Sequence, residues 1–280
     1  MEIHLGSQRI LALEERDSAE QVRQRAMDKR AQAFVNGLGS LLQRPRAEDI
    51  ELVAAQRRLE PFWHIAGVAH YVYERRRDYD VPASGGEVQE VTFGGTTYPV
   101  AGGRGGRTFT ISAVEHCREE IAHELNADAR SGAKVADAVA ILSGPKREVV
   151  DPASLAANDT VVVPPEHRAA FVVRQLLAEM LKPVQADTIL EESLTLSATD
   201  LVYRPVWAFE FHWKPKDRRG VVEIDGITGA IRAGGPLLPQ LGRVITRDAL
   251  FDIGADTVGL LVPGGSIAVK VARAAFDKSY

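Results

Sequence analysis

Two stretches of the chain repeat apolar residues every three or four positions, the spacing that lines one face of an α-helix. The first stretch covers 18–43, where Ser18 and Gln21 form a capping box at the start. The second begins at Pro164-Pro165-Glu166 and carries an apolar stripe from Ala169 to Leu181. Both stretches are therefore predicted to be amphipathic helices that bury one face.

A third helix is predicted from residue 113 to about residue 128. Ser112 and Glu115 have the capping-box spacing. The apolar residues that follow recur at helical intervals: Val114, Cys117, Ile121 and Leu125. Because Cys117 lies on this stripe, we interpret it as a small buried hydrophobe rather than a nucleophile. Shorter helices are predicted at 133–142, 246–254 and 266–278.

Alternating and β-branched residues predict strands between these helices. Val91–Phe93 and Thr96–Tyr98 flank Gly94-Gly95, which is the pattern of a hairpin with a two-residue turn. A small hairpin is also predicted at 3–13, where a Gly-Ser pair separates two apolar runs. Further strands are predicted at 108–111, 160–163, 201–213 and 221–224.

The order of helix, strand and turn occurs twice along the chain. Leu41–Ile50 aligns without gaps with Met180–Ile189, and Pro61-Phe62-Trp63 aligns with Pro205-Val206-Trp207. The alternative is that such patterns recur by chance. The repeat predicts an α+β fold of two duplicated helix-plus-antiparallel-sheet modules, with a helical linker and a helical C-terminal tail. The predicted divisions are an N-terminal hairpin arm (1–17), a first module (18–111), the linker (112–163), a second module (164–235) and the tail (236–280).

The second predicted module carries a recognisable turn motif. Tyr203–Phe209 is followed by Val221–Ile231, in which Asp225–Gly229 has the order Asp-x-x-Thr-Gly. We expect Asp225 to accept hydrogen bonds within the turn and Gly229 to adopt a positive φ. This order resembles PepSY-type modules over residues 166–235. The resemblance implies a helix packed on a short antiparallel sheet, inhibition or binding rather than catalysis, and often an extracytoplasmic location. The first module departs from it, because Gly94 stands where the motif has Asp.

Composition limits the possible partners and compartment. The 280 residues carry 34 Lys and Arg against 38 Asp and Glu, a net charge of -4, which argues against an obligate nucleic-acid binder. The single cysteine cannot form an intramolecular disulfide. Met1–Leu5 lacks a signal-peptide pattern, and no apolar run is long enough to span a membrane. We therefore expect a cytoplasmic protein, in conflict with the location that the PepSY resemblance implies. The sequence contains no dinucleotide-binding fingerprint, and we expect no cofactor, with a divalent metal as the alternative.

One constellation suggests a metal site. His116, Glu120 and His123 are spaced by four and then three residues, so a helix would project all three from one stripe. Imidazole and carboxylate ligands suit a divalent metal such as Zn²⁺, with His64 or His70 as a further ligand. The alternative is a solvated polar face opposite the apolar stripe.

Basic residues gather at three places. Arg75-Arg76-Arg77 and the group Lys214, Lys216, Arg218 and Arg219 occupy matching positions in the two modules, where they predict either a shared patch for an acidic partner or solvated hairpin ends. The glycine-rich loop 102–107 contains Arg104 and Arg107 and predicts either an anion site or a flexible linker.

The C-terminal tail has an uncharged run at 257–269, followed by Lys270 and Arg273. The segment 257–273 predicts a tail docked on the core, a self-association element or a membrane-surface contact. Taken together, the sequence favours a non-enzymatic binding or assembly protein that uses sheet edges, basic hairpin ends or the tail to hold a protein partner or another copy. A metal-dependent enzyme and a peripheral membrane protein are the alternatives.

Overall fold

A computed structural model describes most of the chain. The described residues are 2–34, 45–103, 106–157, 159–180, 184–238, 246–253 and 270–273.

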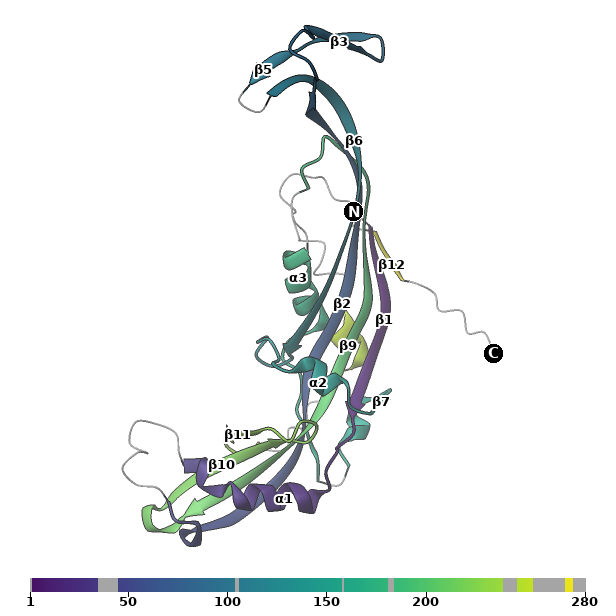
Figure 1. The fold of residues 1–280 in the computed structure, drawn as a ribbon. Coiled ribbons are helices and arrows are strands. Elements are labelled where there is room, and N and C mark those ends of the chain that lie inside the picture. Colours follow the sequence, from purple (N-terminus) through teal and green to yellow (C-terminus); the bar gives the residue numbers. More distant parts are fainter. Residues whose placement is uncertain are drawn as a thin grey trace.

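The described residues are built around one mixed sheet of ten strands, so the predicted α+β fold of two helix-plus-sheet modules is wrong (Figure 1). The long central strand β2 (Ile50–Pro82) lies between β6 (Gly106–Asp128) and β9 (Thr188–Trp213), and both neighbours run antiparallel to it. At about 3.3 Å per residue, the 33 residues of β2 cover roughly 110 Å of chain.

The outer strands complete the sheet. β1 (Glu2–Leu13) runs parallel to β9 as one strand, so the hairpin predicted within 3–13 is wrong. On the same side of β9, β10 (Arg218–Asp225) and then β11 (Ile231–Gly234) continue the sheet in antiparallel order. The short strands are β5 (Ala101–Gly103), β7 (Lys146–Glu148), β8 (Val161–Val162) and β12 (Lys270–Arg273), with β3 (Glu90–Phe93) and β4 (Thr96–Pro99) forming a separate hairpin.

The segments predicted to be two module copies are neighbours within this sheet. Leu59 lies opposite Pro205, and Pro61 lies opposite Tyr203. The two aligned Pro-x-Trp segments therefore lie on paired strands of one sheet and do not belong to two separate sheets. Trp63 is fully buried, whereas Trp207 is half-buried.

Two of the predicted helices are confirmed in part. α1 (Ala19–Asp28) begins with the predicted capping box, and α3 (Ala169–Met180) buries the predicted apolar stripe. The remaining helices are α2 (Ala138–Leu142) and α4 (Arg247–Phe251), with 3₁₀ segments at η1 (Arg30–Phe34), η3 (Ala47–Asp49), η4 (Pro152–Leu155) and η5 (Lys214–Lys216). The ends of the first and second predicted helices, 35–43 and residue 181, lie outside the described residues.

Each longer helix covers part of one sheet face. α3 packs on β2 and β6, where Trp63, Ile65 and Leu125 meet Val172 and Leu176 in the largest apolar cluster. α1 packs near the other end of the sheet, in a cluster that includes Phe209, Phe211 and Trp213. Burial of these apolar side chains makes the main contribution to the free energy that holds both helices on the sheet.

The helix predicted at 113–128 is wrong, because these residues belong to β6. Cys117, Ile121 and Leu125 are four residues apart, and a spacing of four fits one face of a strand as well as one face of a helix. The two residues of the predicted capping box instead make cross-strand contacts with β2, Ser112 with Asp78 and Glu115 with Arg75.

The two predicted glycine turns are confirmed. Gly94 and Gly95 have φ values of 60° and 83° in the β3–β4 hairpin. Asp225 Oδ1 accepts 2.9 Å hydrogen bonds from the backbone N–H groups of Ile227 and Thr228, and Gly229 has a φ of 69°.

In the tail, α4 lies within the predicted helix 246–254. Within the predicted helix 266–278, residues 270–273 are strand β12, which pairs in parallel with β1, so the prediction of a helix is wrong there. Residues 257–269 lie outside the described part of the chain.

Candidate functional site: the β2–β6 arm

The paired ends of β2 and β6 extend beyond the rest of the sheet (Figure 1). β9 accompanies β2 only as far as Glu74, which lies opposite Thr188. From there Arg75–Pro82 pairs with Thr108–Glu115 alone. We call these two segments the arm, and residues 83–107, which include the β3–β4 hairpin, the tip.

The outer edge of β2 in the arm has no described strand beside it, and its backbone groups point in a defined direction. The N–H of Asp187 donates a 2.8 Å hydrogen bond to the carbonyl oxygen of Glu74, and the Asp187 carboxylate accepts one from the N–H of Arg76. Since the backbone groups of successive residues point to alternate sides of a strand, Asp78 and Asp80 also direct their N–H and C=O groups away from β6. No described strand pairs with β2 at these residues.

One face of the arm holds a compact polar group. The Glu115 carboxylate accepts hydrogen bonds from the hydroxyl of Tyr79 and from Nε of Arg75, and Nε of Arg77 lies 3.7 Å away. The Tyr79 hydrogen bond and then the Arg75 hydrogen bond hold the pKa of Glu115 below its ordinary value. The same carboxylate raises the pKa of both Tyr79 and Arg75 through these hydrogen bonds. These contacts tie the two strands together.

The opposite face of the arm is more open. The hydroxyl of Ser112 donates to Asp78, and the hydroxyl of Thr110 donates to Asp80 at 2.7 Å. Val114, on the same face, is 46% exposed. In the tip, Phe93 is 62% exposed at the hairpin turn, whereas Tyr98 packs on Phe109 with ring centroids 6.0 Å apart. The arm and tip thus present apolar and charged side chains to the surroundings.

The candidate metal ligands do not meet on one stripe. In strand β6, His116 and Glu120 share one face, whereas His123, seven residues after His116, faces the side of α3. His116 Nδ1 lies 3.0 Å from Glu74, and His123 Nε2 contacts Glu179 on α3. Among the described residues, no group of three or more His, Cys, Asp or Glu side chains is arranged to hold a metal ion. A divalent metal stays a prediction.

Two further candidate ligands each face a carboxylate on a neighbouring strand. His64 Nδ1 lies 3.0 Å from Oδ1 of Asn126 and 3.5 Å from Glu124. His70 Nδ1 lies 3.4 Å from Glu120, and its Nε2 lies 3.8 Å from Glu191. Because these two carboxylates face different ring nitrogens, they lie on different sides of the imidazole.

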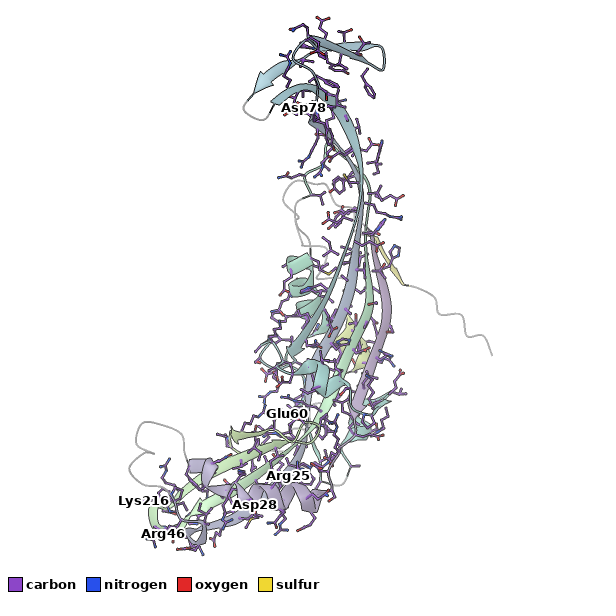
Figure 2. All side chains as sticks on the ribbon, in the orientation of Figure 1. Arg25, Asp28, Arg46, Glu60, Asp78 and Lys216 are labelled. Atoms are coloured by element: carbon purple, nitrogen blue, oxygen red, sulfur yellow. The ribbon has the colours of Figure 1, made fainter. Side chains whose placement is uncertain are left out.

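The two basic groups lie at opposite ends of β2 and do not form one patch. The register places Arg75 just beyond the Glu74–Thr188 pair, whereas Trp213, which precedes η5 and the start of β10, lies opposite Ile50. In Figure 2, Asp78 and Lys216 mark these two ends.

Some of the predicted basic residues already have acidic neighbours. Lys214 pairs with Glu51 at 2.7 Å, and Arg219 with Glu210 at 3.2 Å. Arg107 donates a 2.6 Å hydrogen bond from Nη2 to the carbonyl oxygen of Val88, which fixes its guanidinium inside the tip. Arg104 lies outside the described residues.

The structure contains a buried ionic cluster that the sequence did not predict. Arg58 and Glu223 are only 4% and 5% exposed and contact each other. Glu60 lies 2.8 Å from Arg58, 3.2 Å from Arg204 and 3.0 Å from Arg232. Residues from β2, β9, β10 and β11 contribute, so their proximity depends on sheet register; the only local signal is the alternation Arg58-x-Glu60.

A cavity of about 620 Å³ adjoins this cluster. Four arginines and four carboxylates line it: Arg58, Arg130, Arg204, Arg232, Glu60, Asp128, Glu166 and Glu223. The four arginines balance the four carboxylates, so the lining has no net charge to favour an anionic or a cationic ligand.

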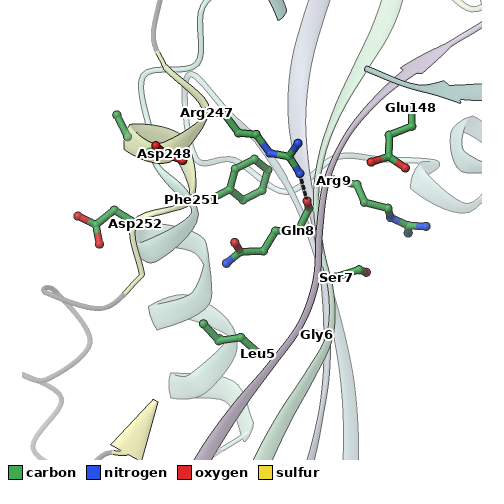
Figure 3. A pocket seen from close by; sticks show the side chains of 11 residues that line it. Leu5, Gly6, Ser7, Gln8, Arg9, Glu148, Arg247, Asp248, Phe251 and Asp252 are labelled. Carbon is green, nitrogen blue, oxygen red and sulfur yellow. Dashed lines mark hydrogen bonds between the residues drawn. The ribbon is translucent and has the colours of Figure 1, made fainter. Parts of the chain in front are cut away.

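A second cavity, of about 870 Å³, lies between β1 and α4 (Figure 3). Arg247 donates a 2.7 Å hydrogen bond to the carbonyl oxygen of Gln8, which ties α4 to β1. Arg9 donates to both carboxylate oxygens of Asp200, at 3.0 and 2.6 Å, and these hydrogen bonds raise the pKa of Arg9. The polar groups here join elements of the fold.

In the part of the chain that the structure describes, no helix is long and apolar enough to cross a membrane. No family model, curated protein or solved structure matches this chain. The PepSY resemblance therefore stays a prediction, and the arm is the feature from which a function can be argued.

Proposed function

We propose that this protein is a non-enzymatic assembly protein whose copies associate through the arm. The supporting observation is that the arm has only two strands, with no third described strand along β2 from Arg75 to Pro82. A two-stranded ribbon is marginally stable in water, and an uncovered strand edge is a template for another strand. Association would supply the missing neighbour.

Exposed apolar side chains along the arm support the same proposal. Tyr79 is 42% exposed and Val114 is 46% exposed, and at the base of the arm Ile189 and Leu190 are 50% and 54% exposed. These side chains lie on both faces of the arm and its base, so each face has apolar surface that association could cover. The metal-dependent and membrane-surface alternatives depend on 113–128, which is strand, and on 257–273, of which only the last four residues are described.

The test removes the arm and keeps the rest of the sheet. Arg77 and Ala113 lie opposite each other, so an Asn-Gly turn replacing 78–112 can join them. We expect the wild-type protein to form a defined oligomer in sedimentation velocity experiments and this arm-shortened variant to be a monomer with an unchanged far-ultraviolet circular dichroism melting temperature. A wild-type protein that stays monomeric at every concentration would overturn the proposal, as would an arm-shortened variant that associates equally well.

A second deletion is the matched control. The N–H of Ala83 donates a 2.8 Å hydrogen bond to the carbonyl oxygen of Arg107, so an Asn-Gly turn replacing 84–106 removes most of the tip and leaves the arm intact. We expect this tip-shortened variant to associate as the wild type does. Loss of association in this variant would assign the contact to the tip and contradict the proposal.

A further inference from the structure

We infer that two copies of this chain pair antiparallel along the outer edge of β2, from Arg76 to Asp80, with Asp78 of each copy on a two-fold axis. The inference rests on the proposed function and deepens it, because it names the edge, register and symmetry of the association. The product is a continuous four-stranded sheet in which the two β2 strands are central and the two β6 strands are outer.

The backbone of this edge is suited to such a ladder. Arg76, Asp78 and Asp80 all direct their N–H and C=O groups outward, as the contacts of Asp187 with Glu74 and Arg76 establish. A two-fold axis that is perpendicular to the sheet and passes between two antiparallel strands places one residue opposite its own copy. With Asp78 in that position, Asp78 faces Asp78, and Arg76 of each copy faces Asp80 of the other; these are hydrogen-bonded pairs. In the Arg76–Asp80 pairs, the N–H of Arg76 exchanges the carboxylate of Asp187 for the carbonyl oxygen of Asp80.

The order of charges along the edge is self-complementary. Arg75, Arg76 and Arg77 come first, and Asp78 and Asp80 follow. Antiparallel pairing therefore sets the basic half of one strand against the acidic half of the other. All residues from Arg76 to Asp80 are exposed, so their side chains can form new contacts. Cross-strand pairs of opposite charge stabilise a sheet, and like charges directly opposite destabilise it.

An axis at Asp78 gives fewer like-charge contacts than an axis two residues earlier, at Arg76. It places Arg76 opposite Asp80 and Arg77 opposite Tyr79, a cationic and an aromatic side chain. The one like-charge pair is Asp78 with its copy, and each Asp78 carboxylate already accepts a hydrogen bond from Ser112. An axis at Arg76 would instead oppose Arg76 to itself, Glu74 to Asp78 and Arg75 to Arg77. The last two pairs each occur twice, so this register gives five like-charge contacts.

Charge exchange tests the register directly. In Arg76→Asp, positions 76 and 80 are both acidic, and in Asp80→Arg both are basic, so each variant alone opposes like charges. We expect each single variant to dimerise about tenfold more weakly in sedimentation equilibrium experiments. An equimolar mixture of the two, and the double variant R76D/D80R, restore the opposite-charge pairs and are expected to dimerise as the wild type does. Lys216→Glu, at the far end of the sheet, is the matched control and is expected to have no effect.

Two further variants address the axis itself. Asp78→Asn removes the like-charge pair and is expected to tighten the dimer. A D78C/C117S variant is expected to form an intermolecular disulfide under mild oxidation, whereas D80C/C117S is not, because only position 78 lies opposite itself. Circular dichroism spectra show whether every variant is folded.

The outcomes separate this inference from the proposed function. If the arm-shortened variant is monomeric while R76D and D80R dimerise as the wild type does, association through the arm stands and the edge and register named here are wrong. If R76D and D80R are each weakened but their mixture is not restored, the antiparallel self-pairing is wrong. A monomeric wild-type protein overturns both.

Discussion

The indole Nε1 of Trp63 donates a 2.9 Å hydrogen bond to the backbone carbonyl oxygen of His167. This contact joins the middle of β2 to the residues just before α3. Trp63 is fully buried, and its ring packs edge-on against Phe251 of α4 with centroids 5.4 Å apart. One side chain therefore joins the sheet to two helices that are distant in the sequence.

Replacing this tryptophan tests its contribution. Trp63→Phe leaves the His167 carbonyl without its donor and creates a small cavity, so we expect the free energy of unfolding to fall by about 2–4 kcal/mol. Trp207→Phe is the control, because Trp207 is only half-buried and donates to the side chain of Glu15 instead of a backbone carbonyl. Urea denaturation followed by circular dichroism measures both. Equal losses in the two variants would show that Trp63 has no special role.

Within the buried ionic cluster, the effects of two substitutions on the unfolding free energy are expected to be strongly non-additive. Arg58→Met leaves the carboxylates of Glu60 and Glu223 in place with less compensation, so we expect a loss of about 3 kcal/mol in unfolding free energy. The double variant R58M/E223L is expected to be more stable than R58M, because it removes the buried charge that R58M leaves behind. Chemical denaturation of the two variants and of E223L completes the cycle. A sum of single effects equal to the double effect would mean that the two side chains are not coupled.

Arg219→Ala compares an exposed ion pair with the buried pair of Arg58 and Glu223. The Arg219 side chain is 64% exposed and lies 3.2 Å from Glu210. Exposed ion pairs contribute about 0–1 kcal/mol, so this substitution is expected to be nearly neutral.

Gly220 marks a close approach between β10 and η1. A Cβ atom at this position would lie 2.4 Å from the backbone carbonyl oxygen of Ala33. Gly220→Ala is therefore expected to displace η1 and to lower the unfolding free energy by about 1–3 kcal/mol. Gly86→Ala is the matched control, because a Cβ atom at Gly86 would have no neighbouring atom within 4 Å. A thermal melt of each variant distinguishes them, and two unchanged melting temperatures would contradict the prediction.

The arm is expected to lose stability in acid. Its contacts lower the pKa of Glu115 from the ordinary value of 4.5, mainly through Tyr79 and then Arg75, so they favour the carboxylate. A lowered folded-state pKa gives stabilisation that is complete above the unfolded pKa and is lost as pH falls through the folded pKa. We expect hydrogen-exchange protection of arm amides to fall in that range for the wild type and to change less in Glu115→Gln. Glu210→Gln, near the other end of the sheet, should behave as the wild type.

Short-range signals in the sequence predicted several elements correctly. Ser18 and Gln21 satisfy backbone groups within one turn of α1, and Gly94-Gly95 supplies the positive φ values of its own hairpin. The stripe that ends at Met180 predicted α3 because its spacing fits only a helix. These features depend on residues a few positions apart, so neighbouring residues carry the necessary information.

For residues 113–128, neighbouring residues do not carry enough information to distinguish a helix from a strand. The spacing of Cys117, Ile121 and Leu125 permits helix or strand, and pairing with β2 makes it a strand. Val114, which the helix prediction placed on the same stripe, is 46% exposed on the other face of β6. The three candidate metal ligands lost their common stripe for the same reason, since a strand of period two separates His116 from His123.

By itself, the sequence determined the caps, the turns and the apolar face of α3, because local backbone geometry and local hydrogen bonds set them. Only the tertiary structure decided that the two Pro-x-Trp strands are neighbours, that Arg58 meets Glu223, and that Arg75–Arg77 stand on an arm far from Lys216. Each of these depends on strand register between residues distant in the chain. Register is chosen by which apolar face the whole sheet buries, a property that no single segment contains.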